Sequence, residues 1–142
     1  LLDFLPPRLG AVLRARMARC FARHPNRDNP YARTLLGGEL PHAAVPAEAR
    51  SVRLVRADAA AFLAQQPAGS FDGFALSNIL DGAAPAYREE LFAALRRAAA
   101  PGAMVVLRSF GEPQAALASN RAADDRAMLW GIVDVRPAAA LE

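Results

Sequence analysis

Apolar residues near the start of the chain recur at helical spacing. They form one side of a predicted helix, and arginines fill much of the other side. The apolar members are Leu9, Val12, Leu13, Met17, Cys20 and Phe21, and the basic members are Arg14, Arg16, Arg19 and Arg23. The pattern predicts an amphipathic helix over residues 7–23.

A short second helix is predicted directly after a polar turn. Asn29-Pro30 is a favourable helix start, and Gly37-Gly38 would end the helix, so we expect it over residues 31–36. The prolines at positions 41 and 46 then favour a loop or short turns over residues 39–50.

From residue 51 onward the pattern changes to alternating strands and helices. The predicted strands cover 52–58, 71–76, 103–107 and 128–135, and the predicted helices cover 59–66 and 85–100. A polar segment, 112–126, precedes the last strand. Strands separated by helices imply crossover connections, so we expect an α/β fold with a mostly parallel sheet. The direction of the last strand stays open.

Polar residues stand where the predicted strands end. In open parallel sheets, ligands bind beyond the carboxyl ends of the strands. This rule points to Asp58, to Ser77, Asn78 and Asp81, and to Arg108 with Ser109.

Length and composition exclude several classes of protein. The chain has 142 residues, enough for one compact domain, and 54% of them are hydrophobic, which is too many for a disordered chain. No apolar run approaches the roughly 20 residues of a membrane-spanning helix. All 17 basic residues are arginine and the net charge is only +3, so nucleic acid is not an expected partner.

The few cysteine and histidine residues limit the chemistry further. Cys20 is the single cysteine, so an internal disulfide is excluded and a reducing, cytoplasmic compartment is expected, since no signal peptide is visible either. Cys20, His24 and His42 have no ligand-like spacing, and we expect no metal site.

Several motifs, taken in order, resemble the second half of a class I S-adenosylmethionine (SAM) dependent transferase. They are most similar to the 3-amino-3-carboxypropyl transferases of betaine-lipid synthesis, which act on the hydroxyl of diacylglycerol. The matching stretches are Asp28-Asn29-Pro30-Tyr31, Arg-Ala-Asp58-Ala, Ser-Phe-Asp72-Gly-Phe with Ser77-Asn78, Pro101-Gly102 with Arg108-Ser109, and Asp124-Asp125-Arg126 with Trp130-Gly131. Together they cover most of residues 26–135.

The resemblance implies a partial Rossmann-like sheet with flanking helices. We expect a helical, lid-like segment over 1–50, the carboxyl-terminal half of the SAM-binding domain over 51–137, and a tail with a vector-derived Leu-Glu over 138–142. No Gly-x-Gly turn is present in the sequence. Because such a turn holds part of SAM in the family, we expect this chain to be a fragment of the active enzyme.

The resemblance also assigns residues to SAM, which would serve as the co-substrate. Asp58 would accept a hydrogen bond from the adenine amino group, with the amide of Ala59 facing the ring. Ser77 and Asn78 would contact SAM after the middle strand. For Asp58 the alternative is a plain helix N-cap.

Other residues are assigned to the acceptor and to catalysis. Asn78 and Asp81 would orient and deprotonate a hydroxyl nucleophile, although both are also ordinary turn residues. The expected acceptor contacts are Asn29, Tyr31, Arg108 and Arg126. Structural ion pairs of the arginines, and a plain helix start at Asn29-Pro30, are the alternatives.

The expected function is transfer of the aminocarboxypropyl group from SAM to a lipid-like hydroxyl. The alternatives are a small-molecule SAM-dependent methyltransferase and a non-catalytic module that binds membrane or nucleic acid through the Arg-rich helix. That helix would also allow peripheral contact with the inner membrane surface. An incomplete sheet further predicts a homodimer that covers it.

Overall fold

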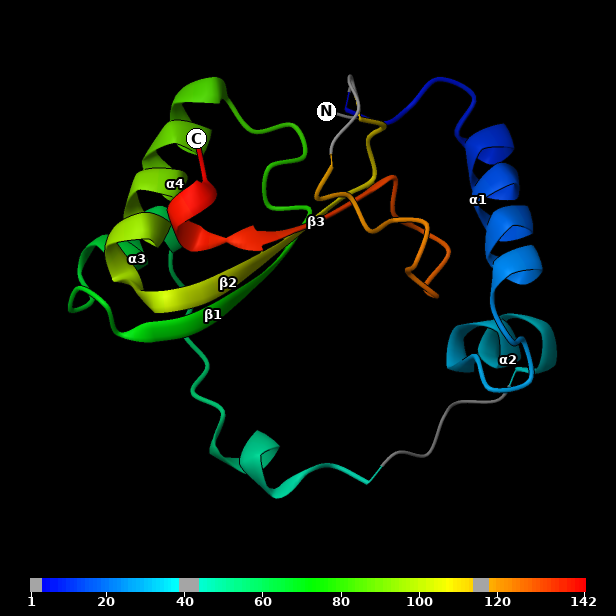
Figure 1. The fold of residues 1–142 in the computed structure, drawn as a ribbon, viewed down its shortest axis with the longest axis horizontal. Coiled ribbons are helices and arrows are strands. Elements are labelled where there is room, and N and C mark those ends of the chain that lie inside the picture. The colour runs from blue at the N-terminus through cyan, green and yellow to red at the C-terminus, as the bar shows by residue number, and fades with distance from the viewer. Residues whose placement is uncertain (1–3, 39–43, 114–117) are drawn as a thin grey trace.

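The computed structural model describes residues 4–38, 44–113 and 118–142. Figure 1 shows a mixed α/β arrangement, with a small sheet and its helices on one side and two further helices on the other. In chain order the elements are α1 (Leu9–Arg23), α2 (Pro30–Gly37), the short turn η1 (Ala47–Ser51), α3 (Ala59–Ala64), β1 (Phe71–Ser77), α4 (Pro85–Ala98), β2 (Ala99–Ser109), β3 (Ile132–Pro137) and the short turn η2 (Ala138–Ala140).

The described sheet has three strands in the order β1-β2-β3. β1 and β2 are parallel and joined by α4, as the predicted crossover requires, whereas β3 is antiparallel to β2. The predicted α/β class is therefore confirmed, with a mixed sheet. The last strand begins at Ile132 instead of residue 128, because Met128 has a positive φ of 66° that is incompatible with a strand.

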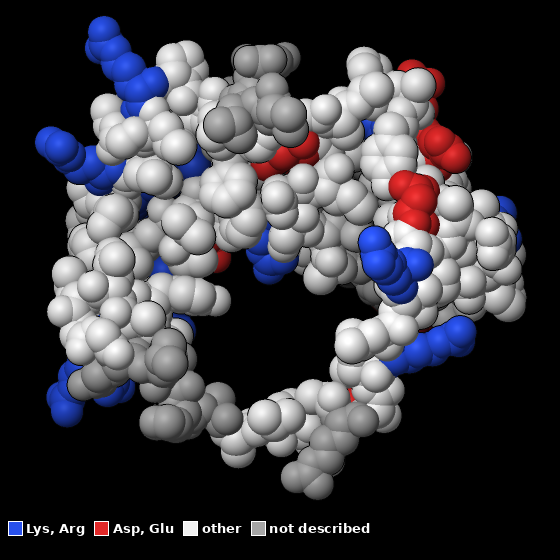
Figure 2. Space-filling model, turned by 180° about the vertical axis from the view of Figure 1, so that it is seen from behind, with Lys and Arg blue, Asp and Glu red and all other residues white. Residues whose placement is uncertain are grey.

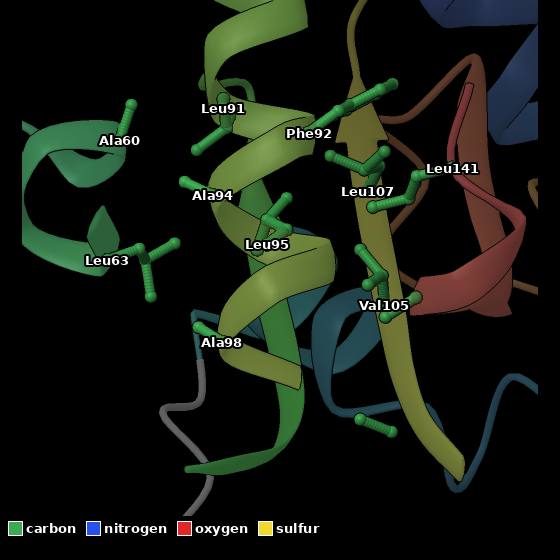
Figure 3. Close-up of a cluster of buried hydrophobic side chains, with 12 residues drawn as sticks. Ala60, Leu63, Leu91, Phe92, Ala94, Leu95, Ala98, Val105, Leu107 and Leu141 are labelled. Carbon is green, nitrogen blue, oxygen red and sulfur yellow. The ribbon is translucent and has the colours of Figure 1, made fainter. Parts of the chain in front are cut away.

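The main core lies between this sheet and the two helices beside it. Figure 3 shows α4 between α3 and β2, with Leu91, Phe92 and Leu95 among the buried side chains. Val105 and Leu107 of β2 pack against α4 from the other side. α3 ends at Ala64, shorter than predicted, where the Arg97 guanidinium of α4 donates to the carbonyl oxygens of Leu63, Ala64 and Gln66.

The strand predicted over 52–58 does not form. Residues 52–56 carry no strand pairing, and Leu54 is 91% exposed. A strand needs a neighbour for its backbone hydrogen bonds, and no described strand lies beside this segment. Of the loop predicted over 39–50, residues 39–43 lie outside the described residues, and 47–51 form η1.

The helices predicted over 7–23 and 31–36 are both present as α1 and α2. They form a second, smaller cluster with the loop before β3, in which Cys20 of α1, Ala32 of α2 and Met128 of the loop are buried together. Gly38 takes the left-handed conformation that ends α2. Cys20 is buried, and this burial raises the pKa of its thiol.

The residues expected as a tail, 138–142, pack against the domain. Leu141 is only 3% exposed and lies against the core beside Leu107, and its carbonyl oxygen accepts a hydrogen bond of 2.9 Å from Arg96 of α4. Ala138 and Leu141 are thus part of the hydrophobic core.

Candidate functional site

Ser77 and Asn78 lie where the sequence places them, at the carboxyl end of β1. Both side chains are exposed, and the Asn78 amide donates to the carbonyl oxygen of Arg108, at the matching end of β2, over 2.8 Å. Asn78 has a positive φ of 43°, a conformation that Asn tolerates better than most residues. The turn thus presents two polar side chains beyond the ends of two parallel strands.

Asp81 joins the same two strand ends. Its Oδ1 accepts a hydrogen bond of 2.5 Å from the Ser109 hydroxyl, and its Oδ2 accepts one of 3.0 Å from the Phe110 amide. The Ser109 oxygen in turn accepts from the Gly111 amide. The half-buried Asp81 carboxylate therefore fixes the loop after β1 against the loop after β2.

Asp58 and Ala59 lie at the start of α3, at the same end of the α/β layer. Asp58 Oδ1 accepts from the Ala61 amide over 2.9 Å, so the predicted helix N-cap is present. The Asp58 carboxylate also lies near enough to Tyr87, in the first turn of α4, to raise the pKa of that hydroxyl. Figure 3 shows Ala60, Leu91 and Leu107 at one end of the layer and Ala98 toward the other, which places the α3 start near the strand carboxyl ends.

The contact between Tyr87 and Asp58 can be tested by titration. Burial and the neighbouring Asp58 carboxylate both raise the pKa of Tyr87 above its ordinary value of 10.0. Its hydroxyl therefore contributes to stability fully below pH 10.0, and this contribution is lost as the pH rises through the folded-state value.

We expect the Tyr31→Phe variant, whose remaining tyrosine is Tyr87, to ionise with a midpoint above 10.0 by ultraviolet absorbance. Adding Asp58→Asn, which keeps an N-cap, should move the midpoint down. A midpoint at or below the ordinary value, or one unmoved by Asp58→Asn, would contradict the contact. Circular dichroism at each pH checks that the chain stays folded.

The residues predicted to bind the acceptor lie mostly on the α1–α2 side. Asn29 is fully buried: its Oδ1 accepts from the Tyr31 and Ala32 amides, and its Nδ2 donates to the Arg126 carbonyl oxygen. It starts α2 and has no exposed surface for a ligand in this conformation. Tyr31, in contrast, is 53% exposed.

The two arginines differ in their surroundings. Arg126 is exposed, and its guanidinium donates to the Asp28 carbonyl oxygen over 3.4 Å. Arg108 is half-buried, and the alternation along β2 places it with Met104 and Val106 on the face opposite the core. Among the described residues its guanidinium has no hydrogen-bond or ion-pair partner, and Asp124 pairs with Arg23 instead.

The residue that sequence reasoning missed is Arg16. Its charge led to its assignment to the polar side of α1, yet Arg16 is only 3% exposed. Its guanidinium donates to the carbonyl oxygens of Phe110 and Leu129 and pairs with Glu112 over 2.5 Å. Arg16 thus links α1 to both loops that flank the strand ends. The signal was present, because Arg16 lies one turn from both Leu13 and Cys20, on the apolar side.

An apolar groove of about 520 Å³ runs between α1, α2 and the loop before β3. Tyr31 and Leu35 of α2 line it together with Leu13 and Met17 of α1, and Leu129 closes it from the loop. Thr34 is the polar exception in the lining. Such a groove suits an apolar ligand with little hydrogen-bonding capacity.

The charged side chains, possible metal ligands and helix lengths of the described residues point to no further site. On the face drawn in Figure 2, the basic side chains lie at separated points and form no single patch. Within the described ranges no three His, Cys, Asp or Glu side chains are grouped to hold a metal ion. No helix in the part that the structure describes combines the length and apolarity needed to cross a membrane.

Comparisons with known proteins assign no relative to this chain. No family model, no curated protein and no solved structure matches it.

Proposed function

We propose that this chain takes part in SAM-dependent transfer of a 3-amino-3-carboxypropyl group to a lipid-like hydroxyl, within a Rossmann-like fold. The observation that carries the proposal is the arrangement of Ser77, Asn78 and Asp81 beyond two parallel strand ends that one helix connects. Parallel strands with such crossovers bind their ligands at this end. Asp58, at the start of α3, lies at the same end of the layer.

The adenosine part of SAM would lie near the start of α3. The Asp58 carboxylate caps the helix and lies beside the Tyr87 hydroxyl, but a carboxylate has about four acceptor positions. It can therefore still accept a hydrogen bond from an adenine amino group. The exposed Ser77 and Asn78 side chains would face the rest of the cofactor.

The proposed reaction needs no general acid, because its leaving group is neutral. The acceptor oxygen attacks the γ-carbon of the methionine part, an ether C–O bond forms, and the C–S bond breaks with its electron pair returning to sulfur. Neutral methylthioadenosine leaves. The hydroxyl proton passes to a base, for which Asp81 is the proposed residue, since each of its oxygens keeps a lone pair beside its present hydrogen bond.

A lipid-like acceptor is favoured by the groove between α1 and α2. Its lining is almost wholly apolar, as an acyl chain would require, and Tyr31 on its wall has a hydroxyl that can reach a more polar part of the acceptor. Arg126 follows in the adjoining loop, where its fork could bind an ester or headgroup oxygen.

The experiment that tests the cofactor site is calorimetric titration of SAM and methylthioadenosine into the complete native gene product that contains this chain. We expect both to bind, and Asp58→Asn to weaken binding by about threefold to tenfold through loss of a charge-assisted hydrogen bond. Glu89→Gln, on the exposed surface of α4, is the control and should bind as the unmodified protein does. Absence of binding by the unmodified protein would overturn the proposal.

A further inference from the structure

β1 leaves its outer edge open. Among the described strands it lies at the end of the order and pairs with β2 alone, on its inner side. The seven residues Phe71–Ser77 contain no proline and no basic residue, which are the usual means of blocking an exposed edge. The edge has one charge, Asp72, which has no partner among the described residues.

Residues 52–56 form a second unpartnered segment. All five are exposed and outside any strand, although Val52 and Val55 are good strand formers. Arg53 and Arg56 have no ion-pair or hydrogen-bond partner in the described part of the chain. Figure 2 shows a wide opening in the molecule, and Figure 1 shows that this stretch of chain runs apart from α1 and α2.

We propose that two copies of the chain dimerise by exchanging these elements, so that residues 52–56 of one copy pair antiparallel with β1 of the other. One register satisfies both sequences. It places Leu54 beside Phe74, Val52 beside Leu76 and Arg56 beside Asp72.

The side chains that would meet across the two strands favour this antiparallel register. Phe74 and Leu76 are half-buried against the core beneath α4, so Val52 and Leu54 would extend that core across the new strand. Arg56 would reach the Asp72 carboxylate, which lies where the pairing of β1 with β2 shifts register between Phe71 and Gly73. In the parallel arrangement that keeps Leu54 beside Phe74, Val52 would face Asp72 and Arg56 would face Leu76, so both outer pairs would be mismatched. A slip by one residue would turn every side chain to the wrong face.

The exchange also gives a closed dimer and not an open chain of copies. Each copy carries both the donor segment and the acceptor edge, so two reciprocal pairings give a symmetric dimer without open ends. This inference does not rest on the proposed transferase activity.

The test is sedimentation equilibrium of the full chain over a range of concentrations. We expect a monomer–dimer equilibrium that Arg56→Glu and Asp72→Arg each weaken by about tenfold, because each creates a like-charge pair that occurs twice in the dimer. The combined variant R56E/D72R restores opposite charges and should regain most of the affinity. Arg53→Glu, which would lie beside Ala75 on the opposite face, is the matched control and should dimerise normally.

A strict monomer at every concentration would overturn the proposal. So would equal weakening by Arg53→Glu and Arg56→Glu, or no recovery in the combined variant. Circular dichroism of each variant verifies the fold, which these exposed side chains do not support.

Discussion

Replacing Arg16 with alanine is expected to lower the free energy of unfolding by about 2–4 kcal/mol. The guanidinium is buried and donates to the carbonyl oxygens of Phe110 and Leu129, which lie in two different loops. Its removal would leave both oxygens without that donor and leave a space where the side chain stood. Glu112 is half exposed and can be hydrated, so the two carbonyl groups dominate the loss.

Urea unfolding monitored by Trp130 fluorescence measures the effect, since Trp130 packs against Phe110 beside this contact. Arg14→Ala, an exposed position on the same helix, is the matched control and should change stability by no more than about 0.5 kcal/mol. Arg16→Lys should fall between the two, because a single ammonium group cannot reproduce the planar fork. If Arg16→Ala were as mild as Arg14→Ala, the linking role would be wrong.

The surroundings of Arg16 are packed so tightly that the neighbouring Gly131 has no room for a side chain. A β-carbon added at the buried Gly131 would collide with the Gly111 carbonyl oxygen and with the Arg16 guanidinium. At Gly10, near the start of α1, an added β-carbon would meet nothing. The contrast shows that glycine is required where the two loops meet α1, and not along the helix itself.

Arg16 also shows where local patterns stop being informative. Periodicity predicted α1 correctly, but Arg16 was assigned to the polar side of the helix because it is charged. Its acceptors lie about 94 to 113 residues further along the chain, and no window of the sequence contains both. Only the tertiary structure reveals that a buried cation is satisfied there.

The segment 52–56 illustrates a different limit. Its composition predicts a strand, and its extended course agrees with that preference, but pairing depends on a neighbour that the described chain does not supply. Strand propensity expresses how well side chains fit a half-buried sheet, not an independent tendency to pair. β1, β2 and α4 were predicted because each of these elements has its partners within the chain. Their common boundary was not: α4 ends at Ala98, and β2 begins at Ala99 instead of residue 103.

The positions of the candidate residues at the strand end could be predicted, but their contacts could not. The rule on strand ends located Ser77, Asn78 and Asp81 together, because it needs only the order of strands. The hydrogen bonds from Ser109 and Phe110 to Asp81, and the contact between Tyr87 and Asp58, depend on loop and helix geometry that no local pattern specifies. For Asn29 the plain helix start describes the geometry.

Asp81→Asn is expected to reduce the rate of transfer by about 100-fold or more, since it removes the proposed base for the acceptor hydroxyl. The asparagine oxygen can still accept from the Phe110 amide, so the loop should keep its position and SAM should bind with unchanged affinity. Glu89→Gln serves as the control at full activity. An equal loss of SAM affinity would instead assign Asp81 to holding the loop.

The most direct test is the product released from SAM when the complete native gene product is incubated with diacylglycerol. The proposed transfer predicts methylthioadenosine, formed in equal amount to a lipid that carries the ether-linked aminocarboxypropyl group, and slowed by Asp81→Asn as above. Formation of S-adenosylhomocysteine would instead show methyl transfer, and release of neither compound would contradict the transferase assignment altogether.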